Sequence, residues 1–179
     1  MFNPNNHLHR RIVLMATRKI NLVLDVGANA GQFGKSLRQA GYQGRIISFE
    51  PMKAAFAALR STASGDSLWT LYNVALGDAD GTATINVSAN SYSSSLLPIN
   101  PHSLRIEPSI GYIGQEEISV RRLDGLFDQF AKPEDVIYLK IDTQGYELKV
   151  MAGVAAIIDR FELIQLEASF IPVYKDEAL

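Results

Sequence analysis

Four acidic residues stand directly behind apolar stretches of the sequence, where they could bind a ligand or move a proton. They are Asp25, Glu50, Asp142 and Glu167. Each follows a short apolar run that is typical of a buried strand, and the carboxyl ends of parallel strands share one edge of an open α/β sheet. One acid in such a position carries little information, but four at one edge predict a polar functional site.

Residues 21–31, NLVLDVGANAG, indicate where this site begins. An apolar strand over residues 22–24 ends in Asp25. The chain then turns through Gly27 towards a helix that starts near Gly31, a pattern typical of the start of a βαβ unit. Gly27 can adopt backbone angles closed to other residues and leaves room for a ligand. Gly31 would let the helix pack close to the sheet, and the N–H groups at the helix start favour an anion.

The spacing of this motif favours a cofactor that carries a nucleoside. Gly27, Asn29 and Gly31 form G-x-N-x-G rather than the G-x-G-x-x-G of dinucleotide enzymes. Glu50 ends the next strand, about 20 residues further on, where an acid can accept hydrogen bonds from both ribose hydroxyls. A nicotinamide-dependent oxidoreductase on the same sheet is the alternative, and the G-x-N-x-G spacing disfavours it.

The composition excludes several classes of function. The 179 residues contain no cysteine, which excludes disulfides, cysteine-ligated zinc and thiol catalysis. The net charge is −2 without a basic stripe, so we expect neither nucleic acid nor an anionic membrane as a partner. No apolar run approaches the roughly 20 residues of a membrane span. These features fit a cytoplasmic protein, and we predict no metal site.

The apolar periodicity predicts alternating strands and helices, with an N-terminal helix in residues 1–20 and one main domain in residues 21–179. Helices are expected over 7–19, 32–40, 52–61, 123–130 and 146–158, and strands over 45–49, 69–72, 117–121, 136–141 and 161–166.

The regular alternation breaks between residues 77 and 122. Residues 77–81 are typical of a turn and residues 82–87 alternate like a strand, so we expect a hairpin. Residues 88–114 have no clear periodicity, and a loop of this length is either a substrate lid or a surface loop. His102 lies in it, either as a catalytic base or as a solvated side chain.

Residues 139–147, LKIDTQGYE, resemble the L-K-I-D-x-x-G-x-E signature of FkbM-type methyltransferases. The same family is matched by residues 23–31, 49–51, 73–78, 93–96 and 123–124. The resemblance implies a class I methyltransferase fold, with a mostly parallel Rossmann-like sheet and helices on both faces. It also implies S-adenosylmethionine (SAM) as methyl donor, and as acceptor a hydroxyl of a sugar, glycan or secondary metabolite.

The resemblance implies a role for each part of the motifs. The cofactor-binding set would be Asp25, Gly27, Asn29, Gly31, Glu50, Pro51, Asn73, Val74, Ala75 and Asp142. The first four would line the methionine end of SAM, Glu50 would hold the ribose, and residues 73–75 would flank the adenine. Asn73 could instead cap a loop, and Asp142 would face the methyl group.

A hydroxyl that attacks a methyl group must lose its proton, so a nearby base is expected. Asp142 is the first candidate, Glu167 the second and His102 the third. Asp142 could instead cap the turn that follows it. Lys140 lies on the same strand face as Asp142 and would pair with an acid, whereas Glu147 would bond the backbone at its own helix start.

The end of the sequence departs from the pattern of class I methyltransferases, which normally continue past the fifth strand with another helix and two more strands. Only twelve residues follow Glu167, so we expect a sheet without its C-terminal strands. An uncovered sheet edge would favour self-association. The short C-terminus also motivates the alternative of a domain that binds SAM without turnover.

Overall fold

The computed structural model describes residues 7–90 and 92–177. Helix α1 occupies His7–Thr17. Residues 1–6 of the expected N-terminal helix lie outside the described residues. Within the described ranges, every helix is too short or too polar to cross a membrane.

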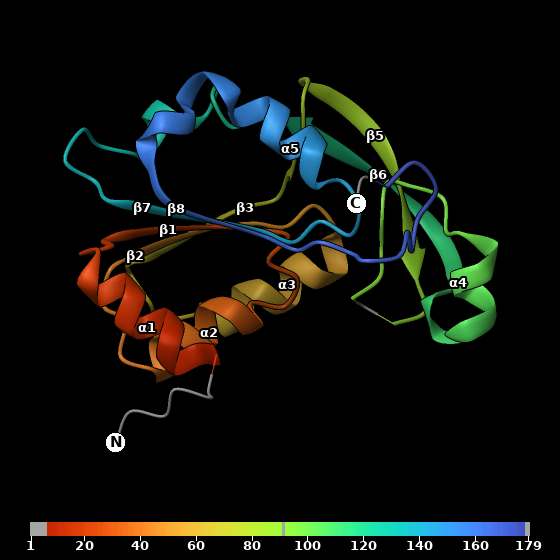
Figure 1. Ribbon diagram of the computed structural model, residues 1–179, viewed down its shortest axis with the longest axis horizontal. Helices are drawn as coiled ribbons and strands as arrows, with labels where there is room; N and C mark the ends of the chain where they lie inside the picture. The colour runs from red at the N-terminus through yellow and green to blue at the C-terminus, as the bar shows by residue number, and fades with distance from the viewer. Residues whose placement is uncertain (1–6, 91, 178–179) are drawn as a thin grey trace.

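Five parallel strands form the central sheet in the order β3-β2-β1-β7-β8 (Figure 1). They are β1 (Leu22–Val26), β2 (Arg45–Phe49), β3 (Trp69–Tyr72), β7 (Ile137–Ile141) and β8 (Phe161–Leu166). One face carries α1, α2 (Gln32–Gln39) and α3 (Lys53–Thr62), and the other carries α5 (Glu147–Val154). The Rossmann-like sheet with helices on both faces is thereby confirmed.

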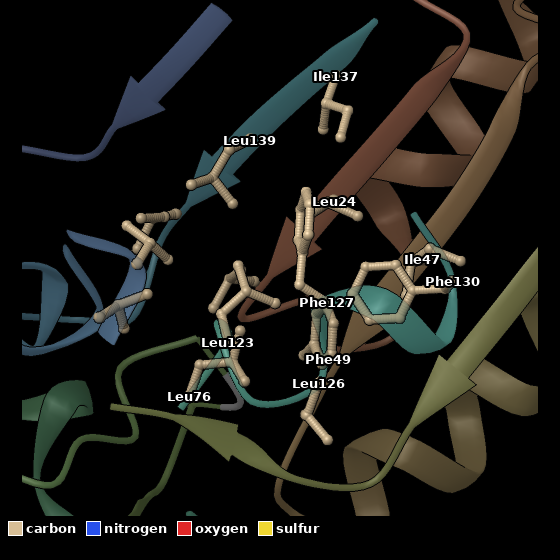
Figure 2. Packing of buried hydrophobic residues seen from close by; sticks show 14 of the residues in the cluster. Leu24, Ile47, Phe49, Leu76, Leu123, Leu126, Phe127, Phe130, Ile137 and Leu139 are labelled. Atoms are coloured by element: carbon tan, nitrogen blue, oxygen red, sulfur yellow. The ribbon is translucent and has the colours of Figure 1, made fainter. Parts of the chain in front are cut away.

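Side chains of each strand alternate between two apolar cores, one on each face of the sheet. On the α5 face, Phe127 and Phe130 pack beside Leu24, Ile47 and Phe49 (Figure 2). On the other face, α1, α2 and α3 contribute Met15, Leu37 and Leu59 to a core with Val23, Ile46 and Tyr138. Because both faces are covered, β1 and β7 are buried along their whole length.

A second sheet, in the order β4-β6-β5, is built largely from the expected insertion. Its strands are β4 (Ala75–Leu76), β5 (Gly81–Ser88) and β6 (Tyr112–Arg121). The hairpin expected through residues 77–81 is wrong, because β4 and β5 lie on opposite sides of β6. The eight residues of β5 find a matching antiparallel partner in the ten-residue β6, whereas β4 has only two residues.

The stretch expected to be irregular contains one short helix, α4 (Pro101–Ile106), followed by a 3₁₀ turn over Pro108–Ile110. The Asn100 side chain caps α4, and Pro101 occupies its first turn. The backbone N–H of Asn100 donates to the Val173 carbonyl at 2.9 Å. The insertion and the chain after β8 therefore lie side by side.

Two expected helices were also wrong in detail. Within residues 123–130, the helical part is one 3₁₀ turn, Phe127–Gln129. The apolar side chains of this segment are nevertheless buried, so they pack into the core without forming a complete α-helix. The helix expected over 146–158 ends at Val154 and continues as a 3₁₀ segment, Ala155–Arg160. In the described part of the chain, no strand pairs with the outer edge of β8.

The glycine turn after β1 requires left-handed backbone angles. Gly27 has φ +75° and Gly31 has φ +85°. A Cβ on Gly27 would lie 1.9 Å from the Asp142 carbonyl oxygen, so this glycine makes room for the backbone that follows β7. A Cβ on Gly31 would meet Leu59 of α3 at 2.8 Å. The sequence suggested that Gly31 lets its helix pack close to the sheet. Instead, Gly31 allows close packing against α3.

Substitution of Gly27 tests this close approach. We expect Gly27→Ala to lower the free energy of unfolding by about 3 kcal/mol or more, because the methyl group overlaps a backbone carbonyl. Gly41→Ala is the matched control, since Gly41 also has positive φ (+92°) but has no neighbouring atom within 4 Å of a built Cβ. It should cost only about 1–2 kcal/mol. Urea unfolding of both variants measures the difference, and equal losses would contradict the account.

Candidate active site

The carboxyl ends of β1, β2, β7 and β8 meet at one edge of the central sheet and border a cavity of about 440 Å³. Glu50, Asp142 and Glu167 line this cavity. The second sheet and its loop supply an apolar wall, made of Val74, Ala75, Leu76, Ile85, Leu96 and Ile118. The predicted polar site at the ends of the strands is therefore a cavity with a charged side and an apolar side.

Lys140 is the buried cation at the floor of this cavity. Its Nζ lies 3.1 Å from Asp25 Oδ1 and 3.4 Å from Asp142 Oδ2. The amine also donates to the carbonyl oxygen of Gly27 at 3.4 Å. Burial by itself would lower the pKa of Lys140, but the charges of Asp25 and Asp142 outweigh it and raise that pKa. Lys140 is therefore held as a cation, which confirms its expected pairing with an acid.

Glu50 is almost fully buried but faces the cavity. Its Oε2 accepts a hydrogen bond from the Asn29 N–H at 2.8 Å, and its Oε1 accepts one from the Met52 N–H at 2.9 Å. Burial raises the pKa of Glu50 to about 7, although these two hydrogen bonds act in the opposite direction. Each carboxylate oxygen has a second lone pair, so Glu50 can still accept from a ligand.

Asp142 and Glu167 are neighbouring carboxyl groups that can share a hydrogen bond when one of them is protonated. This hydrogen bond is the largest contribution that raises the pKa of Glu167 to about 7, and burial adds to it. Burial acts to raise the pKa of Asp142, but the bond with Glu167 and the charge of Lys140 outweigh burial and lower it. The two groups titrate as a unit, which can hold one proton near neutral pH.

Gln144 bridges the carboxylate pair. Its Nε2 donates to Asp142 Oδ1 at 3.0 Å and to Glu167 Oε2 at 2.7 Å. The residue has a left-handed backbone, with φ +58°, which is uncommon for a side chain of this kind. Ser95 Oγ donates to its carbonyl at 2.6 Å, and the Tyr174 hydroxyl donates to its Oε1 at 3.1 Å. The insertion and the segment after β8 therefore hold Gln144 in place.

The sequence matches the family model of the methyltransferase FkbM domain over residues 25–179. This chain belongs to the FkbM methyltransferase family. It is 24% identical over 177 residues to the 2-O-methyltransferase NoeI of Sinorhizobium fredii (strain NBRC 101917 / NGR234), an alignment that covers 95% of this chain and 72% of NoeI. It is 26% identical over 158 residues to methyltransferase sdnD of Sordaria araneosa, covering 74% of this chain and 60% of sdnD. No solved structure matches.

The cavity of this FkbM methyltransferase contains most of the residues that the sequence singled out. Gly27, Asn29, Glu50, Pro51, Val74, Ala75, Asp142 and Glu167 line it. Asp25 does not, because its carboxylate is fully buried beneath the cavity and faces Lys140 and Ser48. Gly31 also lies outside the lining, against α3.

Asn73 and His102 are placed away from the cavity lining. The Asn73 side chain donates to the carbonyl oxygens of Glu50 and Pro51 at 2.8 and 2.9 Å, so it braces the loop after β2. His102 is exposed on α4, and its ring contacts the Arg105 side chain. Within the part of the chain that the structure describes, His102 does not line the cavity that holds the carboxylate pair.

The cavity of this methyltransferase is also lined by polar residues that the sequence analysis did not single out for the site. Among them are Arg11, Gln32, Thr143, Gln144 and Gln165. Gln165 stands two residues before Glu167, so strand alternation could have placed both on one face. Glu147 Oε1 accepts from the Thr143 N–H at 2.8 Å, which confirms its expected role at the start of α5.

The buried Lys140 can be tested by removing its charge. Lys140→Met would leave Asp25 buried without a cation, so we expect the free energy of unfolding to fall by about 3–5 kcal/mol. The double variant Asp25→Asn/Lys140→Met should recover part of this loss, because the fully buried Asp25 is no longer a charge without a cation, and only the partly exposed Asp142 loses its partner. Lys149→Met is the control, since Lys149 is exposed and should matter little. Urea unfolding at pH 7 makes the comparison, and a double variant less stable than Lys140→Met would contradict the pairing.

Proposed function

We propose that this methyltransferase moves a methyl group from SAM to a hydroxyl of a sugar, glycan or secondary metabolite. The carrying observation is that the Asp142–Glu167 pair lies in the same cavity as Glu50. A methyl donor and a proton acceptor are both needed for an O-methylation, and this cavity offers groups suited to each. The printed name of the similar NoeI, a 2-O-methyltransferase, supports an oxygen acceptor.

The residues that line the cavity fit SAM. The volume of about 440 Å³ lies within the usual range for small-molecule sites. Glu50 is a buried acceptor suited to ribose hydroxyls, and the apolar wall with Val74 and Ala75 suits an adenine ring. The carboxylates of Asp142 and Glu167 would offset positive charge near them. When bound, SAM supplies a methyl group activated by a positively charged sulfur.

The protein's own part in the reaction is to orient the acceptor, exclude water and remove a proton. In this proposal the apolar wall excludes water on one side of the reacting groups. Orientation of the acceptor hydroxyl can contribute on the order of several kcal/mol to the rate. As the hydroxyl attacks, its O–H bond breaks and the proton passes to the Asp142–Glu167 pair. A base in this position accelerates such a step by about 10²–10⁴-fold.

A direct test of the proposed reaction uses a panel of hydroxyl-bearing sugars, glycans and secondary metabolites with SAM. Mass spectrometry should detect a methylated product that is absent when SAM is left out. SAM binding without any product across the panel would instead support a non-catalytic SAM-binding domain.

Glu50 should govern the affinity for the cofactor. Glu50→Ala removes the acceptor for the ribose hydroxyls, so we expect SAM to bind about 10-fold more weakly or worse. Glu117→Ala, an exposed change on β6, should leave the affinity unchanged. Calorimetric titration gives both dissociation constants, and thermal unfolding confirms that each variant is folded. Equal affinity in both variants would remove Glu50 from the cofactor site.

The carboxylate pair predicts a pH dependence of turnover. Below about pH 7 the pair already holds a proton, whereas above it both groups are ionised and can accept one. At saturating SAM, kcat should therefore rise with pH through about 7 and level off. Glu167→Gln should abolish this rise, because it removes the carboxyl whose pKa is about 7, while the charge of Lys140 still acts to lower the pKa of the remaining Asp142.

Asp142→Asn should lower kcat by about 10²-fold or more while the affinity for SAM changes much less. Steady-state rates from pH 5.5 to 9 (roughly the range that brackets the pair) measure both effects. An unaltered kcat in Asp142→Asn would show that the Asp142–Glu167 pair is not the base.

A further inference from the structure

Helix α1 contributes one charged side chain, Arg11, to the lining of the cavity. This helix precedes residues 25–179, which match the family model, so the family match assigns Arg11 no role. The guanidinium lies 5.0 Å from the centre of the Phe33 ring, on the first turn of α2. Its Nη2 donates to Gln165 Oε1 at 3.3 Å. Arg11 therefore spans the cavity edge between α2 and β8.

Arg11 differs from Lys140 in how its charge is matched. Lys140 lies between the carboxylates of Asp25 and Asp142. Within residues 7–90 and 92–177, none of the ion pairs involves Arg11. Its acceptor Gln165 is a neutral amide, which the Tyr138 hydroxyl also contacts. The cavity thus has one cation already neutralised and one still able to bind an anion.

A guanidinium offers five N–H donors in a planar fork that matches a carboxylate. The guanidinium lies over the Phe33 ring and also interacts with the Tyr138 hydroxyl and Gln165, so part of its fork is held by the protein and the remaining donors can face a ligand. Phe33 belongs to the helix that begins directly after the glycine turn, on the side of the cavity assigned to the methyl donor. The donor proposed above carries one carboxylate, at its methionine end.

We propose that Arg11 binds the carboxylate of the methyl donor and thereby anchors its methionine end. This inference rests on SAM as the donor. It extends the cofactor site to a residue of α1, and it makes this helix part of the binding site rather than only a cover for the sheet.

The test combines a change in the protein with the matching change in the ligand. Calorimetric titrations would use SAM and decarboxylated SAM, which lacks only the carboxylate, against the unchanged protein and Arg11→Met. Methionine keeps an apolar stem to pack on Phe33. Arg10→Met is the control. Arg10 is exposed on the same helix, next to Arg11, and its substitution removes the same charge.

We expect Arg11→Met to lower the affinity for SAM by about 10-fold or more and to change the affinity for decarboxylated SAM by less than about 2-fold. Arg10→Met should leave both affinities unchanged. An equal loss of affinity for both ligands, or no loss of affinity for SAM, would overturn the assignment. A defect confined to the KM of an anionic acceptor would also overturn it. If the unchanged protein binds neither ligand, the proposed function fails with it, whereas SAM binding that is indifferent to Arg11 rejects this inference alone.

Discussion

The buried ion pairs of Lys140 are the interaction on which the site depends. The parallel register of β1 and β7 places Asp25 directly opposite Lys140, in the centre of the sheet. A cation at that depth is tolerated only with well-placed carboxylates, and Asp25 and Asp142 provide them from two sides. The same amine bonds the carbonyl of Gly27, whose missing Cβ admits the backbone of Asp142. The ends of β1 and β7 are thus held together, and the cavity forms above them.

Around this centre, segments far apart in the sequence converge on one group of polar side chains. The turn at Gln144 joins the carboxylate pair to Ser95 of the insertion and to Tyr174 beyond β8. The second sheet closes the opposite side with apolar side chains. A ligand in the cavity would therefore meet a charged floor fixed by the central sheet and walls supplied by the insertion. This division suits a reaction in which one group is held for transfer and a second is deprotonated.

Much of the fold and part of the site could be predicted from the sequence, because the signals were local. Apolar runs gave all five strands of the central sheet, four of them ending at or next to an acid, and the glycine turn and Glu50 fell where expected. What failed depended on contacts across the chain. Strand alternation alone does not tell which face a cavity occupies. Asp25 was therefore expected in the cavity lining, although it is buried beneath the cavity and forms an ion pair with Lys140. The partner of β5 was missed for a similar reason, since β6 lies beyond 23 intervening residues, 89–111.

The central claim is that this cavity binds SAM, and calorimetric titration of the unchanged protein tests it most directly. SAM, its demethylated product and NADH would be titrated in turn under the same conditions. The account predicts that SAM or its demethylated product binds in the micromolar range and that NADH does not bind. Binding of NADH in place of SAM would contradict the account and favour an oxidoreductase on the same sheet.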